Sequence, residues 1–539
     1  MKRTLYLAWL SSILISAALR AEVAPVGIFS DHAVLQQGVP IPVWGRAKDG
    51  ERVSVSFDGQ TETTVAKDGK WMVRLKAHAA GGPFVMTIAG ENTITIKDVL
   101  VGEVWMCGGQ SNMNNGFGSA ANAATEGPLA NYPQMREFHV TSRSAIRPVA
   151  DLGYDEKRGG HWVVCSPKDV GTFGAVSYFF GRGIHKATGV PVGLIRAAIG
   201  GTAAQCWTSL DGLKKEPTLS GYVDQYEKEV PSYDEEAAKY PQAMADFQTK
   251  YKEWFNTVGK THQDAVKAVD EKNKKNDAEG KPRIPRPAPP LPQPKQPRAP
   301  GGGANTPALL FNGMIAPVIP YAIKGTIWYQ GEANSAKGFE YRTLFPRLIS
   351  DWREKWGLGE TPFLFVQITP HNTITPEIRE AQFLTSQTVP NTAMAVTVDV
   401  GMANDIHSPL KEPVGVRLAL AARALAYGEK IEYSGPAYNS FTIEQNKIIL
   451  RFTHVGGGLV AKSGALKGFV IAGADKKFVE AKAEIVGDTV VVSSEQVASP
   501  VAARYGWANV PDVNLWNKDG LPASPFRTDP EAITQSVKK

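Results

Sequence analysis

The sequence predicts an α/β protein whose core is a mostly parallel sheet with helices on both faces, flanked by N-terminal and C-terminal β-sandwich-like regions. Two patterns predict this. Near-continuous apolar runs in the middle of the chain end at Gly, Gln or Asp, and helix-like stretches separate several of them. Short segments of alternating apolar and polar residues lie on either side. Continuous apolar runs are typical of strands covered on both faces, and alternation is typical of strands with one exposed face.

The first residues of the chain have the pattern of a secretory signal. Lys2 and Arg3 precede an apolar run from about Leu5 to Leu19, and small residues end at Ala21. An uncleaved membrane anchor is the alternative, but the apolar run is shorter than the roughly 20 residues of a spanning helix. We therefore expect residues 1–21 to be removed, leaving a periplasmic or secreted protein without a membrane span.

Residues 22–99 are expected to form an N-terminal β domain, because segments of alternating apolar and polar residues between turn residues predict antiparallel strands. Residues 429–539 are expected to form a C-terminal β region for the same reason. The alternating segments are IPVWG, RVSVSFDG, KWMVRLKA and FVMTIAG in the first region, and KIILRFTHVGGGL, GFVIAGADKKFV, TVVVSS and VAARYGWAN in the second.

Residues 100–428 contain the apolar runs expected to form the central sheet. These runs are VGEVWMC, VPVGLIRAAIG, IKGTIWYQGE, PFLFVQI and TAMAVTVDVG. An insert at about 209–305 interrupts them. Its first part is rich in Glu, Lys, Tyr and Ala, which predicts charged helices, and nine prolines between Pro282 and Pro300 predict an extended connector. We interpret the insert as an excursion on the lid side or a spacer.

Composition limits the classes of function. The 539 residues are 43% hydrophobic and 21% charged, which is ordinary globular composition with material for more than one core. The formal net charge is +6, but the densest basic run, DEKNKKNDAEGKPR, is interleaved with acids and is typical of a solvated helix face. We therefore expect no nucleic-acid partner. The only cysteines, Cys107, Cys165 and Cys206, allow one disulfide and a free thiol, or three buried apolar residues.

Chemically active residue types follow the apolar runs, and in open α/β sheets functional groups gather at the carboxyl ends of strands. They are Ser111 with Gln110 and Asn112, Gly200 with Gly201 and Thr202, Gln330 with Gly331 and Glu332, and Asp405 with His407. A serine hydroxyl needs a nearby base, and histidine, with an ordinary pKa of about 6.5, serves at neutral pH. Backbone N–H groups at a glycine turn and a side-chain amide stabilise an oxyanion.

Each of these features also has a structural interpretation. Ser111 is suited to capping a helix N-terminus, Gly200 and Gly201 to a tight turn, and Gln330 and Glu332 to capping or surface pairing. Together, however, the residues favour nucleophilic attack on an ester.

Four blocks in this order, GGQSNM, GLIRAAIGGT, GTIWYQGEAN and NDIHSPLKEPVGVRLAL, resemble the SGNH hydrolases and, more narrowly, the bacterial sialate O-acetylesterase family. FSDHAVLQQGVPIPVWGRA near the start is similar to the opening β domain of that family, and VGGGLVAKSGALKGFVIAG with RYGWANVPDVNLWNKDGLPASPFRTD to its close. The resemblance covers nearly the whole mature chain except the proline-rich insert. It implies that residues 100–428 are a catalytic domain with an SGNH-type, flavodoxin-like sheet.

The resemblance also implies roles for individual residues. Ser111 would be the nucleophile and His407 the general base that later protonates the leaving alcohol. The oxyanion hole would comprise the N–H of Ser111, the N–H of Gly201 and the side-chain amide of Gln330. The alternatives are Gly200 in place of Gly201, and Asn334 as a weaker candidate for the amide. No metal or organic cofactor is required.

The sequence departs from the superfamily pattern at the acid that orients His407. The wider superfamily has Asp-x-x-His, but Asn404 stands three residues before His407 here, and Asp405 stands two before it. Proximity favours Asp405. Glu332 is the reserve, and a Ser-His dyad steadied by a backbone carbonyl stays open.

The sequence therefore predicts an exported serine esterase that removes O-acetyl groups from sialic acid through an acyl-enzyme. An esterase of acetylated xylan or another polysaccharide is the runner-up. A non-catalytic carbohydrate-binding protein is the alternative from another class. The candidate partners for a sialic acid carboxylate are Arg196, Arg353, Arg379 and Arg417.

Overall fold

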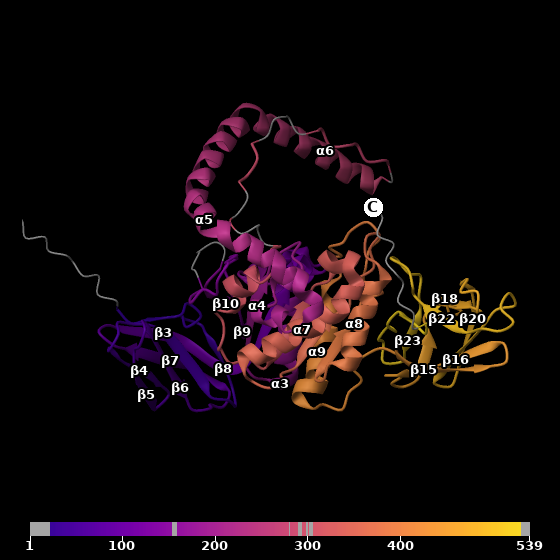
Figure 1. Ribbon diagram of the computed structural model, residues 1–539, viewed down its shortest axis with the longest axis horizontal. Coiled ribbons are helices and arrows are strands. Elements are labelled where there is room, and N and C mark those ends of the chain that lie inside the picture. Colours follow the sequence, from indigo (N-terminus) through magenta and orange to yellow (C-terminus); the bar gives the residue numbers. More distant parts are fainter. Residues whose placement is uncertain are drawn as a thin grey trace, which may run out of the picture.

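The computed structural model describes residues 22–152, 159–279, 281–288, 294–297, 300 and 305–529. The predicted signal, residues 1–21, lies outside them. Figure 1 shows an N-terminal β domain, a central α/β domain and a C-terminal β domain in a row, with a helical arm above the central domain. The mixed α/β architecture predicted from the sequence is confirmed.

The N-terminal domain is built from two sheets that share the residues of one apolar core. The first sheet contains β1 (Ala24–Pro25), β3 (Ile41–Arg46) and β6 (Lys70–Leu75). The second contains β2 (Val34–Gln36), β4 (Arg52–Phe57), β5 (Gln60–Val65), β7 (Gly81–Ala89) and the start of β8 (Thr93–Gly109). The 17-residue strand β8 then continues into the central domain, so the boundary expected between residues 99 and 100 falls inside a strand.

The central sheet has the strand order β10-β9-β11-β8-β12-β13-β14, and every neighbouring pair is parallel except β10 with β9. The strands are β9 (Tyr132–His139), β10 (Trp162–Cys165), β11 (Val192–Ala198), β12 (Gly325–Tyr329), β13 (Phe363–Val366) and β14 (Thr392–Ala395). A mostly parallel sheet is thus confirmed.

The lateral order of the strands differs from the flavodoxin-like expectation. Numbered along the chain, the six parallel strands lie in the order 2-3-1-4-5-6, whereas the flavodoxin-like order is 2-1-3-4-5. The difference arises because β11 lies between β8 and β9, a neighbour relation that an apolar run does not encode. β8 is the strand from which the connections diverge to the two sides, and ligands of open α/β sheets bind outside the carboxyl end of such a strand.

Helices cover both faces of the central sheet. The four long ones are α3 (Ala175–Thr188), α7 (Gly338–Trp356), α8 (Pro376–Thr388) and α9 (Lys411–Tyr427). α3 packs on α9, and α7 packs on α8. Along β8, the Trp105 ring contacts Phe180 of α3, while a Cβ added at Gly108 would meet Trp352 of α7. Residues three apart in a strand point to opposite faces, so the two helix pairs lie on opposite sides.

The shorter helices of the central domain connect these elements. They are α1 (Ser111–Asn114), α2 (Ala123–Glu126), α4 (Leu210–Lys214), the 3-10 turns η1 (Phe117–Ser119), η2 (Gly127–Leu129), η3 (Val170–Thr172), η4 (Ala204–Cys206), η5 (Pro217–Leu219) and η9 (Glu332–Lys337), and the π turn η8 (Phe311–Ile315).

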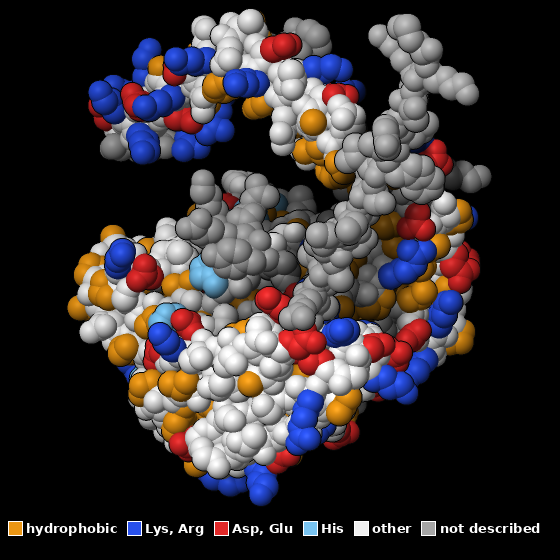
Figure 2. Space-filling view, turned by 90° about the vertical axis from the view of Figure 1, so that its left-hand side faces the viewer, with side chains coloured by type: hydrophobic (Ala, Val, Ile, Leu, Met, Phe, Trp, Pro, Cys, Tyr) orange, Lys and Arg blue, Asp and Glu red, His pale blue; other side chains and the backbone are white. Residues whose placement is uncertain are grey.

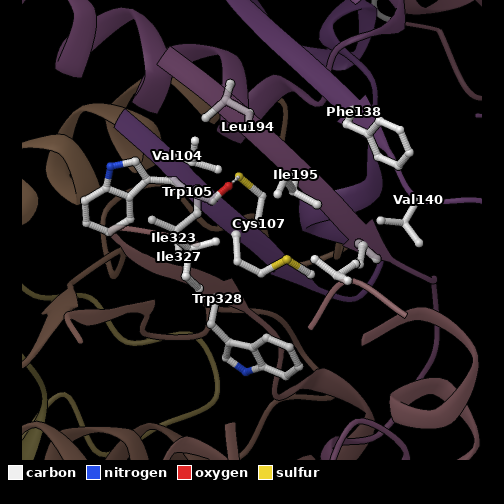
Figure 3. Packing of buried hydrophobic residues seen from close by; sticks show 14 of the residues in the cluster. Val104, Trp105, Cys107, Phe138, Val140, Leu194, Ile195, Ile323, Ile327 and Trp328 are labelled. Carbon is white, nitrogen blue, oxygen red and sulfur yellow. Dashed lines mark hydrogen bonds between the residues drawn. The ribbon is translucent and has the colours of Figure 1, made fainter. Parts of the chain in front are cut away.

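The three cysteines are buried and free. Figure 3 shows Cys107 of β8 among apolar side chains of the neighbouring strands, including Leu194, Ile195 and Ile327. The alternative of one disulfide is therefore not realised, and the cysteines pack as small apolar residues.

The insert forms an arm that leaves the central domain and returns to it. It comprises α5 (Ser220–Trp254), the π turn η6 (Phe255–Gly259) and α6 (Lys260–Ala278). The part of the proline-rich segment that the structure describes lies along α6, where Asn273 exchanges two hydrogen bonds, 2.7 and 2.9 Å long, with the backbone of Ile284. Figure 2 shows the arm standing off the body, with Lys and Arg side chains gathered on it.

The base of the arm is anchored in the central domain. Tyr226 of α5 lies in a small apolar cluster with Ile146, Ala308 and Leu309, and Tyr233 packs against the same cluster. The hydroxyl of Tyr226 donates a hydrogen bond to the carbonyl of Ile146. The residues before the projecting part, in α5, and those after it, at Ala308 and Leu309, therefore lie next to one another.

Excision of the arm beyond this anchor, residues 236–304 replaced by a short Gly-Ser linker, is expected to leave a folded protein. The ends are close, and loop-closure entropy depends only weakly on length. Circular dichroism should show a cooperative thermal transition within about 5 °C of the full chain. As a control, extending the excision back to Tyr222 removes two buried tyrosines and should lower the midpoint further. Loss of the transition in the first variant would make the arm an integral part of the fold.

The C-terminal domain has its own apolar core. One sheet contains β15 (Ala437–Glu444), β16 (Lys447–Thr453), β20 (Lys482–Val486) and β21 (Thr489–Ser493), a second contains β18 (Phe469–Ala472), β19 (Val479–Glu480), β22 (Ala502–Tyr505) and β24 (Phe526–Arg527), and a pair is formed by β17 (Leu459–Ala461) and β23 (Leu515–Asn517). A buried ion pair joins this domain to α8, with Arg527 Nε 2.6 Å from Glu380 Oε1. Within the described ranges, no helix combines the length and the hydropathy needed to span a membrane.

Candidate active site

The ends of three adjacent strands meet at one edge of the central sheet. Gly109 of β8 is in register with Ala198 of β11 on one side and with Tyr329 of β12 on the other. The segments that follow these residues begin at Gln110, Ile199 and Gln330. The structure thus brings together three of the four groups that the sequence singles out.

Ser111 lies at the tip of a tight turn between β8 and α1. Gly109 has φ +143°, and a Cβ there would lie 2.2 Å from the carbonyl oxygen of Tyr329, so only glycine fits. The N–H of Gln110 donates to the same carbonyl at 3.0 Å. Ser111 is the first residue of α1 rather than its N-cap, which is Gln110, so the capping interpretation does not apply. Its half-buried hydroxyl has no hydrogen-bond partner among the described residues.

The Gly200–Gly201 turn lies directly against this serine. A Cβ added at Gly200 would be 3.4 Å from Ser111 Cβ, whereas nothing lies within 4 Å of one at Gly201, whose φ is +72°. Within the described ranges, no acceptor is found for the backbone N–H groups of Ser111, Gly200 or Gly201. These donors remain available to a ligand oxygen at the turn.

The Gln330 side chain is fully buried beneath the same turn. Its Nε2 donates to the carbonyl of Thr202 at 3.2 Å and to Asn334 Oδ1 at 2.7 Å, and its Oε1 accepts from the Tyr341 hydroxyl at 2.9 Å. Asn334 in turn donates to Gln205 Oε1 at 3.1 Å. Both amides are therefore bonded to protein acceptors in this structure. The contact of Gln330 with the glycine turn is its hydrogen bond to the carbonyl of Thr202, the residue that follows Gly201.

His407 and Asp405 lie in the loop between β14 and α9, and both are exposed. Asp405 Oδ1 accepts a hydrogen bond of 2.8 Å from the backbone N–H of His407. Within the part of the chain that the structure describes, the His407 ring has no hydrogen-bond partner. The carboxylate of Asp405 is thus placed beside His407 and fixes its backbone.

The Asn112 side chain connects this loop to the serine turn. Asn112 is buried and follows Ser111 directly. Its Nδ2 donates to the carbonyl of Ile406 at 3.0 Å and to Glu332 Oε1 at 2.6 Å, while its Oδ1 accepts from Lys411 Nζ at 2.5 Å. One amide therefore contacts the residue before His407, the first residue of η9 and the first residue of α9.

Glu332 and Lys411 are the charged groups of this network. Burial raises the pKa of Glu332, which the hydrogen bond from Asn112 and the charge of Lys411 oppose. Burial lowers the pKa of Lys411 to about 8, while Glu332 and Asp405 act to raise it. Glu332 Oε2 is buried and has no hydrogen-bond partner among the described residues.

The four arginines proposed as partners for a sialic acid carboxylate are all bonded to protein groups. Arg196 pairs with Glu137 at 2.9 Å and Arg417 with Asp399 at 2.7 Å. Arg353 donates to the carbonyls of Thr361 and Asn391, and Arg379 to those of Ala508 and Asn509. Arg196 also donates to Asn114 Oδ1 at 3.0 Å, so it supports α1 from below.

Sequence reasoning missed Lys411 entirely. Its signal is weak, because a single lysine at the start of an apolar helix normally extends its ammonium into water. Only its spacing of four residues after His407 placed it near the predicted site.

A family model described as "Carbohydrate esterase, sialic acid-specific acetylesterase" matches residues 311–424. Sialate O-acetylesterase of Rattus norvegicus is 30% identical over 455 residues, which are 76% of this chain and 75% of the relative. Sialate O-acetylesterase of Homo sapiens is 27% identical over 468 residues, 79% and 75% of the two chains. The solved structure of a carbohydrate acetylesterase from Xanthomonas citri is 34% identical with a TM-score of 0.74, and the match covers 94% of this chain and 100% of that one.

Proposed function

Because this carboxylic ester hydrolase belongs to the sialate O-acetylesterase family, we propose that it removes O-acetyl groups from sialic acid by a Ser-His-Asp mechanism. The observation that carries the proposal is the position of Ser111. Its Cβ lies 3.4 Å from where a Cβ added at Gly200 would be, and the next residue, Asn112, contacts the His407 loop. The relatives are esterases, which sets aside a non-catalytic carbohydrate-binding protein.

In the first step, His407 takes the proton of the Ser111 hydroxyl as Ser111 Oγ attacks the acetyl carbonyl carbon. The resulting oxyanion accepts hydrogen bonds from the N–H groups of Ser111 and Gly201. That neither group has an acceptor among the described residues supports this role. Gln330 is the proposed side-chain donor, and it would exchange its longer bond, 3.2 Å to Thr202, for the oxyanion.

The tetrahedral intermediate collapses to an acetyl-enzyme, and His407 gives its proton to the departing sugar hydroxyl. Water then attacks the acetyl carbonyl with His407 as base, and acetate leaves as Ser111 recovers its proton. Asp405 is the proposed acid that stabilises the imidazolium. Its contact with the backbone of His407 supports it, and the bond of Glu332 to Asn112 makes Glu332 less available.

A neutral acetylated glycan such as xylan is the second candidate substrate. It is favoured because Arg196, Arg353 and Arg417 donate to protein acceptors, and because Arg379, whose Nε and Nη1 have no partner among the described residues, is fully buried. Recognition of a sialic acid carboxylate would then rest on other donors, such as backbone N–H groups.

Measurement of acetate release from O-acetylated sialic acid and from acetylated xylan, at equal acetyl concentration, tests the substrate. We expect kcat/KM for the acetylated sialic acid to be at least about tenfold higher, the ratio given by one well-placed charge-assisted hydrogen bond. A chromogenic acetate ester serves as the control for an intact catalytic site. A preference for xylan would replace sialic acid by the neutral glycan and leave the esterase mechanism in place.

Export is also part of the proposal. The charged, apolar and small-residue pattern of residues 1–21 supports cleavage after Ala21. Mass spectrometry of the protein from the periplasm or medium of a bacterial host should find Glu22 at the N-terminus. An intact Met1 on the recovered protein would contradict cleavage.

A further inference from the structure

The Asn112 amide lies between two opposite charges. Its oxygen accepts from the Lys411 ammonium at 2.5 Å, and its nitrogen donates to the Glu332 carboxylate at 2.6 Å. If the amide were turned by 180°, its oxygen would face the carboxylate and its NH₂ the ammonium, and both contacts would become repulsive. The two charges therefore specify one orientation of this amide.

The orientation matters because the same nitrogen, Asn112 Nδ2, also donates a hydrogen bond to the carbonyl oxygen of Ile406, 3.0 Å away. Ile406 precedes His407, whose own N–H is bonded to Asp405. Ser111 precedes Asn112 on the other side. Asn112 thus links the backbone next to the proposed base with the backbone next to the proposed nucleophile, and a turned amide would lose this link.

Lys411 is an unusual residue for its place in the chain. It is only 2% exposed, and it begins α9, where the positive end of a helix dipole disfavours a cation. Within the described residues, the single hydrogen-bond acceptor of its ammonium is Asn112 Oδ1. With a pKa of about 8, set mainly by burial, it is protonated at neutral pH. A buried charge with one neutral acceptor destabilises the fold unless its charge partners compensate, and Glu332 and Asp405 are the charges that do so here.

We propose that Lys411 is a positioning residue of the esterase, which acts with Glu332 to orient the Asn112 amide and thereby fixes the His407 loop against the Ser111 turn. This role rests on the proposed function of Ser111 and His407. Lys411 contacts neither the substrate nor the reacting atoms in this scheme. Its replacement therefore affects kcat through the alignment of nucleophile and base and leaves substrate binding nearly unchanged.

The test is a double-mutant cycle on hydrolysis of p-nitrophenyl acetate. Lys411→Met keeps the length of the side chain and removes its charge. We expect kcat to fall on the order of 10²-fold, the effect of a misplacement of about 1 Å, with KM within about twofold. Lys430→Met, at an exposed lysine just beyond α9, is the matched control and should keep the kcat of the wild type.

Adding Glu332→Gln to Lys411→Met is expected to restore part of kcat, or at least not to lower it further, because the double variant leaves no unpaired buried carboxylate. Multiplication of the two single losses would overturn the proposal, as would a kcat within about threefold of the wild type for Lys411→Met. If Lys411→Met does not fold, the double variant decides. A reduced kcat at unchanged KM then supports the role, and a wild-type kcat overturns it.

The proposed function fails separately. Full turnover by Ser111→Ala would remove the nucleophile and with it the basis of the positioning role. An inactive Ser111→Ala together with a wild-type kcat for Lys411→Met would overturn the role of Lys411 alone.

Discussion

Replacement of Ser111 by Ala is expected to lower kcat on a chromogenic acetate ester on the order of 10⁶-fold while leaving the fold intact. The hydroxyl has no hydrogen-bond partner among the described residues, so its removal leaves no buried group unsatisfied. The loss arises because no other nucleophile in the turn can form the acetyl-enzyme.

Ser119→Ala is the matched control for this variant. Ser119 follows in the same connection and is exposed, and its hydroxyl donates to the carbonyl of Gly116 at 2.8 Å. It should retain full turnover. Both variants are compared with the wild type by circular dichroism and by labelling with an organophosphate, which should modify the wild type and Ser119→Ala but not Ser111→Ala. Unchanged turnover by folded Ser111→Ala would show that the nucleophile lies elsewhere.

Asp405→Asn is expected to lower kcat on the order of 10⁴-fold, as removal of the orienting acid does in serine proteases. The asparagine oxygen can still accept the N–H of His407, the bond that Asp405 Oδ1 makes at 2.8 Å. The loop should therefore keep its shape and lose only the charge that stabilises the imidazolium. Glu332→Gln is expected to lose less, on the order of 10- to 10²-fold, because its effect on His407 passes through Asn112.

The ranking of these two variants on one acetate ester distinguishes the three candidate arrangements. A near-total loss for Glu332→Gln beside a modest one for Asp405→Asn would transfer the role of acid to Glu332. Losses of at most about 10²-fold in both would indicate a Ser-His dyad. Either result would leave Ser111 and His407 in place.

Periodicity in the sequence was enough to predict most strands but not all of them. The apolar runs that become β8, β11, β12, β13 and β14 are recognisable because both faces of these strands are covered. β9 was missed because it carries Arg136 and Glu137, which look like surface residues. Both are buried. Arg136 forms an ion pair with Asp98 of β8, and Glu137 forms one with Arg196 of β11. Such pairing depends on residues far away in the chain, which no local pattern contains.

The candidate site was predicted to the same extent. Ser111 and the glycines of the next turn were recognisable because a buried strand must end in a turn, and parallel strands end at one edge. The internal bonding of Gln330 and the buried contact of Lys411 were not, since side-chain direction depends on tertiary packing. The sequence could place these residues near the site, but it could not tell which of their atoms face a substrate.

The continuity of β8 limits how this protein can be divided into separate domains. One strand carries the pairing of the N-terminal domain at its start, where Thr93 lies opposite Ala89, and the nucleophile turn just beyond its end. A cut near residue 99 would sever the strand on which Ser111 stands, so the N-terminal domain is not a cassette that recombination or cloning can exchange freely. The N-terminal domain is joined to the catalytic turn by a strand and not by a linker, so its orientation relative to Ser111 cannot change by rotation about a linker.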